Sequence, residues 1–289
     1  MARGINNAGQ IVGEFYAPET HGFLKDGAIF TTIDVPGTLG GQAFGINDAG
    51  RIVGTFFDAR GNHGFLKDGA IFTTIDAPGA LDTRAFGIND FGQIVGEFND
   101  ASGRHGFLKD GATFATIDVA GATGTQARGI NDSGQIVGSF FDGRGFHGFL
   151  KDGAVFSTID PPGATTFTIP AGINDFGQIV GSFFDGTGGH GFLKDGAIFT
   201  TIDVPAATDT EAFTSSSGIN DAGQIVGFFF VVGDPNPHSF LATPLPEPAS
   251  WLLYGSGLVG LIGWKRTQAI IGRLRRIRWA APKIRPAHS

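Results

Sequence analysis

The sequence predicts an all-β repeat protein, and three observations support that prediction. Glycine supplies 48 of the 289 residues, more than twice the usual share of roughly 7%, and each glycine costs roughly 1 kcal/mol relative to alanine inside a helix. The repeated part of the chain lacks the i, i+3, i+4, i+7 apolar pattern of an amphipathic helix. A compound motif recurs six times at intervals of 41 to 46 residues, which is typical of repeat architectures.

Two sequence runs define the repeat. Gly-Ile-Asn is followed, six residues after its glycine, by Gln-Ile-Val-Gly, with Arg51 replacing the glutamine in the second copy. The six copies start at Gly4, Gly45, Gly87, Gly129, Gly172 and Gly218. The second run, His-Gly-Phe-Leu-Lys-Asp-Gly, begins at His21, His63, His105, His147 and His190, and a degraded copy begins at His238. Each intact copy leads to a Thr-Ile-Asp that ends at Asp34, Asp76, Asp118, Asp160 or Asp203.

Each unit is predicted to hold four strands, as the second unit illustrates. Residues 42–46 form a short apolar run, and 47–50 form an Asn-Asp turn before a second strand at 51–57. A loop at 58–62 precedes a third strand at 63–66. The Lys-Asp-Gly at 67–69 predicts a tight hairpin into a fourth strand at 70–76. Four antiparallel strands in about 42 residues are typical of a propeller blade, and a β-solenoid is the main alternative.

We therefore predict a β-propeller-like body over residues 1–243, with about six four-stranded blades. The last blade is expected to be incomplete, because the sixth Thr-Ile-Asp strand is missing. The chain starts within the first strand of unit one, and no secretory leader precedes it. We expect either imperfect closure of the ring or a natural start further upstream.

Charge and cysteine content exclude several classes of protein. Cysteine is absent, which rules out disulfides and cysteine–zinc sites. The segment 265–289 carries eight basic and no acidic residues, so residues 1–264 hold 12 basic and 27 acidic residues, a net charge of −15. An acidic body gives no electrostatic reason to bind nucleic acid. We expect no nucleic-acid partner.

The repeated polar residues are interpreted as structural. A ring of the six histidines (His21, His63, His105, His147, His190 and His238) suggests a metal site, but metal ligands must converge within about 2.0–2.3 Å of one ion, and equivalent positions on separate blades lie further apart. The Asn-Asp-x-Gly turns lack the alternating ligands of a calcium loop. We expect loop-capping histidines with a structural or ligand-contacting role, turn-forming Asn-Asp pairs, and no cofactor or metal.

No catalytic constellation stands out, and a non-enzymatic role is predicted. Catalytic residues should break a repeat, whereas the polar residues here belong to it. The positions that do depart from the repeat are interpreted as loop residues, such as Glu14, Glu19, Glu97 and Glu211.

The C-terminal part predicts a membrane segment. A proline-rich linker at 244–250 precedes an uncharged run at 251–264, and a basic tail follows at 265–289. Residues 249–264 are predicted to enter the lipid bilayer as a single short helix. Trp251, Tyr254 and Trp264 are expected at the membrane interfaces, and the basic tail in the cytoplasm.

These runs resemble two known bacterial features. Gly-Ile-Asn-Asp-x-Gly-Gln-Ile-Val-Gly with His-Gly-Phe-Leu, over residues 4–243, resembles the HAF-type extracellular repeat. Pro246-Glu247-Pro248, the apolar run and Lys265-Arg266 resemble a PEP-CTERM sorting signal. That resemblance implies an inner-membrane precursor in a Gram-negative bacterium, recognition by an exosortase-type membrane protease, cleavage near the Pro-Glu-Pro, and delivery to the cell surface or extracellular matrix. The basic tail is longer than such signals usually have, since 23 residues follow Arg266.

The expected function is that of an exported surface or biofilm-matrix protein whose repeats bind or organise a partner, with exopolysaccharide as the candidate ligand. One alternative is an intracellular or tail-anchored protein-interaction scaffold. A second is a propeller glycan hydrolase or lyase.

Overall fold

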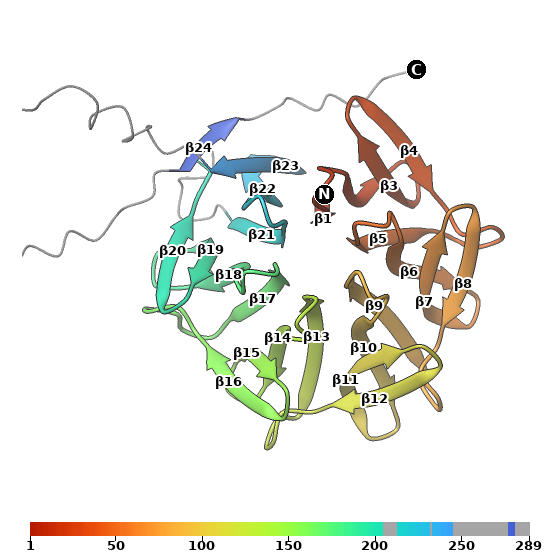
Figure 1. The fold of residues 1–289 in the computed structure, drawn as a ribbon. Helices are drawn as coiled ribbons and strands as arrows, with labels where there is room; N and C mark the ends of the chain where they lie inside the picture. The colour runs from red at the N-terminus through yellow and green to blue at the C-terminus, as the bar shows by residue number, and fades with distance from the viewer. Residues whose placement is uncertain (205–212, 232, 245–276, 281–289) are drawn as a thin grey trace, which may run out of the picture.

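Antiparallel sheets arranged around a central axis make up the structure (Figure 1). The computed structural model describes residues 1–204, 213–231, 233–244 and 277–280. Every regular element in these ranges is a strand, as the sequence predicts. None of the described residues forms a helix that could cross a membrane, and the predicted membrane segment lies outside them.

Each blade has four strands in sequence order, with the first nearest the axis and the fourth on the rim (Figure 1). Blades one to three contain β1 (Ala2–Ile5), β2 (Ile11–Tyr16), β3 (Thr20–Asp26), β4 (Ile29–Ile33), β5 (Gly41–Ile46), β6 (Ile52–Asp58), β7 (Gly61–Asp68), β8 (Ile71–Ile75), β9 (Asp82–Ile88), β10 (Ile94–Asp100), β11 (Gly103–Asp110) and β12 (Thr113–Ile117). Blades four and five contain β13 (Gly124–Ile130), β14 (Ile136–Phe141), β15 (Phe146–Asp152), β16 (Val155–Ile159), β17 (Thr168–Ile173), β18 (Ile179–Phe184), β19 (Gly189–Asp195) and β20 (Ile198–Ile202).

The sixth blade takes its outer strand from far along the chain. It contains β21 (Phe213–Ile219), β22 (Ile225–Val231), β23 (Asp234–Pro244) and β24 (Ile277–Ala280). β24 pairs antiparallel with β23, from Leu241 opposite Ala280 to Pro244 opposite Ile277. Residues 277–280 are predicted from sequence to belong to the basic tail, with no fourth strand in this blade. That prediction is wrong, because Ile277–Ala280 takes the position left by the missing Thr-Ile-Asp.

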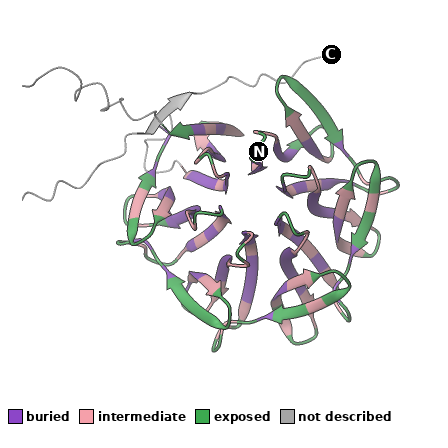
Figure 2. Cartoon of the chain, viewed as in Figure 1, coloured by how far each residue is buried: buried purple, intermediate pink, exposed green. Residues whose placement is uncertain are grey.

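The blades pack against one another through a repeated aromatic core. Phe65, Phe107, Phe149 and Phe192, one from each of blades two to five, are among the largest fully buried side chains. Each lies against the glycine of the preceding Ile-Val-Gly: a Cβ on Gly54 would lie 2.6 Å from the ring of Phe65 and 2.0 Å from a backbone oxygen. Residues of the inner strands are largely buried, and the outer strands of blades one to five are largely exposed (Figure 2).

The ring closes between blades six and one. A Cβ on Gly218 would meet the backbone of Arg3 at 2.9 Å and the Cα of Gly4 at 3.1 Å, much as Gly45 approaches Gly87 between blades two and three. The Ala2 amide donates to Ser239 Oγ at 3.0 Å. The six inner strands are therefore equally close around the axis.

A β-bulge interrupts the inner strand of every blade. In blade two, Ala43 lies opposite Gly54 and Gly45 opposite Val53, so the intervening Phe44 has no partner on β6. The same shift precedes the Gly-Ile-Asn of every blade. Each inner strand runs toward an Asn-Asp turn. We call that end of the axis the turn face, and the end with the loops joining second to third strands the loop face.

Candidate functional site

Each repeated histidine is fixed inside its own blade. His63 Nδ1 lies 2.9 Å from Asp76 Oδ1, and its Nε2 lies 3.2 Å from Asp58 Oδ1. Its ring stacks on Phe56, with centroids 5.2 Å apart. Burial lowers the pKa of His63, but the hydrogen bonds and charges of Asp76 and Asp58 outweigh burial and raise it above the ordinary value. The hydrogen bond to Asp34 likewise raises the pKa of His21.

The same arrangement recurs around the ring. The Nδ1 atoms of five histidines contact the aspartate of Thr-Ile-Asp at 2.8–3.0 Å, and His238 contacts Asp234 instead. Five of the histidines thus connect the third strand to the end of the outer strand, through a carboxylate and not through the backbone carbonyl expected of a loop-capping histidine. Among the described residues, no group of three or more His, Cys, Asp or Glu is placed to hold a metal ion.

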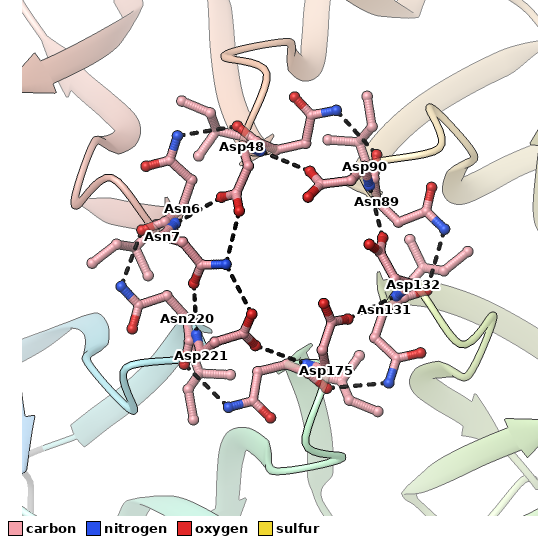
Figure 3. A pocket seen from close by; sticks show the side chains of 18 residues that line it. Asn6, Asn7, Asp48, Asn89, Asp90, Asn131, Asp132, Asp175, Asn220 and Asp221 are labelled. Atoms are coloured by element: carbon pink, nitrogen blue, oxygen red, sulfur yellow. Dashed lines mark hydrogen bonds between the residues drawn. The ribbon is translucent and has the colours of Figure 1, made fainter.

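On the turn face, buried asparagines connect all six blades (Figure 3). Asn47 Nδ2 donates to the carbonyl of Asn89 at 3.0 Å, and Asn220 closes the ring by donating to the carbonyl of Asn6 at 3.0 Å. Each of these asparagines also accepts, through Oδ1, from the amide of the residue four positions later at 2.9 Å. The six are Asn6, Asn47, Asn89, Asn131, Asn174 and Asn220.

A second ring of side chains follows directly (Figure 3). Five aspartates accept from the preceding blade's backbone amide at 2.8–3.0 Å: Asp48, Asp90, Asp132, Asp175 and Asp221. Burial and the neighbouring carboxylates raise the pKa of Asp90 and Asp175. Blade one supplies Asn7 instead, whose Nδ2 donates to Asp48 and Asp221 at 2.8 Å each. The space inside this ring is about 70 Å³. The hydrogen bonds of the ring connect neighbouring blades.

The bulged residues face the axis, and unlike the turns they differ from blade to blade. In blade order they are Arg3, Phe44, Phe86, Arg128, Ala171 and Ser217, which we call the collar. The Arg3 guanidinium lies 5.8 Å from the ring centroid of Phe44, and that of Arg128 lies 5.1 Å from Phe86. The two phenylalanines meet edge to face at 5.2 Å. A bulge re-aims one side chain, so the collar is where the repeat becomes asymmetric.

Two glutamates lie deep in the crevices beside the collar. Glu14 on β2 and Glu97 on β10 are 2% and 1% exposed. Arg3 donates to Glu14 through Nη2 at 2.6 Å and Nε at 3.2 Å, and Gln42 of blade two also donates to Glu14. The interpretation of Glu14 and Glu97 as loop residues is therefore wrong: both occupy the strand position after Ile-Val-Gly, where other blades place small or apolar side chains.

The crevice between blades three and four holds three of the arginines. Gln126 donates to Glu97 at 2.5 Å, while Arg84 and Arg104 lie 3.5 and 3.7 Å from its carboxylate. Arg128 Nη2 donates to Gln126 Oε1 at 2.9 Å, and its Nε is buried without a hydrogen-bond partner among the described residues. Burial lowers the pKa of Arg128 to about 10. The neighbouring arginines act in the same direction and Glu97 opposes them. Arg128 thus remains cationic near neutral pH with an unused donor.

An arc of phenylalanines continues from this crevice across the loop face of blades four to six. Successive ring centroids lie 5.1–6.2 Å apart along Phe141, Phe146, Phe167, Phe184, Phe213 and Phe228. We call this set the aromatic arc. Most of its rings are partly exposed, Phe184 to 37%. At its far end, Phe228 packs under the Arg3 guanidinium at 4.8 Å, so the arc and the collar meet.

A cavity of about 310 Å³ lies where the arc begins, between blades three and four. It is lined by Asn99, Asp100, Gly103, Arg104, Thr123, Gly124, Gln126, Ser139, Phe141 and Phe146. This volume is at the lower end of the range of small-molecule sites, roughly 300–1,000 Å³.

The predicted sorting and anchor residues lie outside the described residues: Pro246, Glu247, Pro248, Trp251, Tyr254, Trp264, Lys265 and Arg266. Glu211 also lies outside them, and Glu19 is exposed beside β3. The arginines of the loop face and the aromatic arc are absent from the sequence expectations. Both could have been found by aligning the six units and marking each position where one unit departs from the others.

Comparison with known proteins supports the fold. No family model matches the sequence, and no curated protein matches it. Similar solved structures include TolB from Acinetobacter baumannii, with 12% identity, a TM-score of 0.53, and coverage of 68% of this chain and 52% of that one. The chain thus spans about half the length of that structure. The fold is that of a propeller.

Two further similar structures have lower scores. A nidogen/laminin complex has 11% identity, a TM-score of 0.48, and coverage of 80% of this chain and 88% of that one. Regucalcin, described as a calcium-binding protein from Agrobacterium tumefaciens, has 12% identity, a TM-score of 0.47, and coverage of 82% and 84%. At these identities the likeness concerns the fold alone.

Proposed function

We propose that this protein is a non-enzymatic binding module that holds a polysaccharide on the loop face of its propeller. One observation carries the proposal: most of the charged and aromatic side chains that distinguish one blade from another lie toward this end of the axis. The turn face repeats its Asn-Asp pairs with a single change at Asn7, whereas the loop face combines four arginines, two buried glutamates and the aromatic arc. Residues that serve only to join blades have no reason to differ between them.

The aromatic arc supplies the surface that a sugar chain needs. Phenylalanine rings offer broad apolar faces with few rotatable bonds, so they bind at a low cost in conformational entropy. The C–H faces of pyranose rings pack against such rings, while hydroxyl groups need polar partners at the edges. Asn99 and Arg104 line the adjoining cavity with partly exposed side chains and provide such partners.

We further propose that the protein reaches the cell surface or matrix by exosortase-dependent sorting. This part of the proposal is supported by the resemblance of residues 244–266 to a PEP-CTERM signal. Expression with and without an exosortase tests it: removal of the C-terminal part only when the enzyme is present supports the proposal. An uncleaved protein, with repeats protected from protease in spheroplasts, would favour the intracellular scaffold.

Affinity electrophoresis of the full chain through gels containing bacterial exopolysaccharide tests binding. The variants Phe146→Ala and Phe184→Ala should lose retardation. Phe91→Ala is the matched control, because Phe91 is 73% exposed but lies in an Asn-Asp turn on the opposite face. Equal retardation of all three variants would contradict the assignment of binding to the loop face, and no retardation of the unmodified chain in any polysaccharide would contradict the binding function.

A further inference from the structure

We infer that the loop face selects polysaccharides that carry carboxylate groups, that is, chains containing uronic acids. This inference rests on the function proposed above and specifies its ligand class. The arginines beside the collar and the composition of the cavity between blades three and four support it.

More than half of the arginines in the repeated body lie beside the collar, on this side of the axis. Residues 1–264 contain 12 basic residues, five of which are the lysines of the repeated Lys-Asp-Gly hairpins. Four of the seven arginines gather beside the collar: Arg3, Arg84, Arg104 and Arg128. Two buried glutamates, Glu14 and Glu97, oppose them. An excess of cationic groups inside an otherwise acidic body focuses the local potential and favours an anionic ligand.

The arginines keep capacity for a further anion. Arg84 and Arg104 share the single carboxylate of Glu97 at 3.5 and 3.7 Å, distances longer than a strong charge-assisted hydrogen bond. Their side chains are 43% and 42% exposed. The Nε of Arg128 is buried and has no partner among the described residues. Arg128 is not one of the residues that line the cavity but lies behind Gln126, to which its Nη2 donates at 2.9 Å, so it adds positive charge to the site without touching the ligand. A ligand carboxylate is the acceptor that guanidinium groups bind in a bidentate manner.

The cavity between blades three and four brings a positively charged side chain and aromatic rings together. Arg104 and Gln126 line it together with Phe141 and Phe146, so a sugar ring against the phenylalanines would present a ring carboxylate to the guanidinium. Asp100 also lines the cavity, but its carboxylate already accepts from Ser102 and Gly103 and contacts His105. These contacts hold Oδ1 of Asp100 within its own loop.

Calorimetry of the full chain with matched oligosaccharides tests the inference. Trigalacturonate is compared with its fully methyl-esterified form, and trimannuronate with mannotriose, so that each pair differs chiefly in charge. At least one acid should bind ten-fold or more tightly than its neutral counterpart. Raising the salt concentration from 50 to 300 mM should weaken the affinity for the acid and leave the affinity for the neutral sugar unchanged, since salt screens exposed charges.

Variants identify the groups responsible. Arg104→Gln and Arg128→Gln should each lower the affinity for the acidic oligosaccharide ten-fold or more. Arg128→Lys should recover part of that affinity, because it restores the positive charge. Arg144→Gln is the matched control: it removes an exposed arginine from the β14–β15 loop on the same face and should change the affinity less than two-fold. Arg104 is partly exposed, so its variant keeps the test decisive if Arg128→Gln fails to fold.

The outcomes separate this inference from the function on which it rests. Equal binding of acids and neutral sugars would overturn the selectivity for carboxylates while the proposed polysaccharide binding stands. Binding of none of the four sugars, together with the absence of retardation in exopolysaccharide gels, would overturn both. An equal loss in Arg144→Gln and Arg104→Gln would show that general surface charge, and not this site, attracts the acid.

Discussion

Replacing Asn7 by aspartate tests whether the ring on the turn face holds the propeller together. Asn7 is nearly isosteric with aspartate, and its Oδ1, which accepts from the Asp221 amide at 2.8 Å, would be kept as a carboxylate oxygen. Its Nδ2, which donates to Asp48 and Asp221 at 2.8 Å each, would become a second carboxylate oxygen. The substitution thus removes two donors and places six carboxylates in one ring.

The magnitude follows from the geometry. Two like charges about 4 Å apart repel by about 1 kcal/mol in bulk water and about 4 kcal/mol at an effective dielectric constant of 20, and two such contacts are created. Proton uptake sets the ceiling, because protonating an aspartate of ordinary pKa at pH 7.5 costs about 5 kcal/mol at about 1.36 kcal/mol per pH unit. We expect Asn7→Asp to lower the free energy of unfolding by about 2–5 kcal/mol at pH 7.5.

Urea unfolding at pH 7.5 and pH 4 measures this effect. The loss should shrink toward pH 4, because the added carboxyl takes up a proton there. Asp132→Asn is the control: it removes one charge and keeps an oxygen for the Asp90 amide, so it should be neutral or stabilising at pH 7.5. If Asn7→Asp were as stable as the unmodified protein at pH 7.5, or if its loss did not change with pH, the reasoning would be refuted.

Two other predictions concern the blades. Because the folded-state pKa values of His21 and His63 are raised, their stabilising contribution is complete below the unfolded value of about 6.5 and is lost as pH rises through the folded values. The urea midpoint should therefore fall between pH 6 and pH 8, and less steeply in a His21→Gln/His63→Gln variant; an unchanged slope would contradict this. Gly54→Ala should cost at least about 2 kcal/mol through overpacking, since its Cβ would meet a backbone oxygen at 2.0 Å. Gly186→Ala, which meets nothing within 4 Å, should be nearly neutral in thermal unfolding, and equal losses would refute the packing argument.

Much of the fold could be predicted from sequence because its determinants are local and repeated. Asp-Gly hairpins, Asn-Asp turns and β-branched runs each specify their own conformation, and six copies make the pattern plain. The position of Ile277–Ala280 beside β23 could not be predicted, because a strand distant in sequence carries no mark of its partner. Closure of the ring could not be predicted either, because the hydrogen bond from Asn220 to Asn6 joins residues that are 214 positions apart in the sequence.

The candidate site was harder to predict because its residues are those that differ from one repeat to the next. Glu97 lies in a strand directly after Ile-Val-Gly. In the sequence alone, however, a charged residue whose partner is unknown predicts an exposed loop position. Only the neighbouring blade shows that Gln126 and the arginines accompany it. The aromatic arc has the same origin, because its six rings come from three blades and each blade supplies only two of them.

The bulge beside each Gly-Ile-Asn has a consequence for how such a protein can change. A bulged residue has no ladder partner, so its side chain can be exchanged without altering the pairing of its blade. Each of the six units therefore offers one replaceable position at the axis, as Ala171 and Ser217 illustrate beside Arg3 and Arg128. Duplication of a single unit followed by point substitution at these positions would generate new specificities on an unchanged frame. Arg3 is an exception, because its exchange would leave the buried Glu14 without its ion pair.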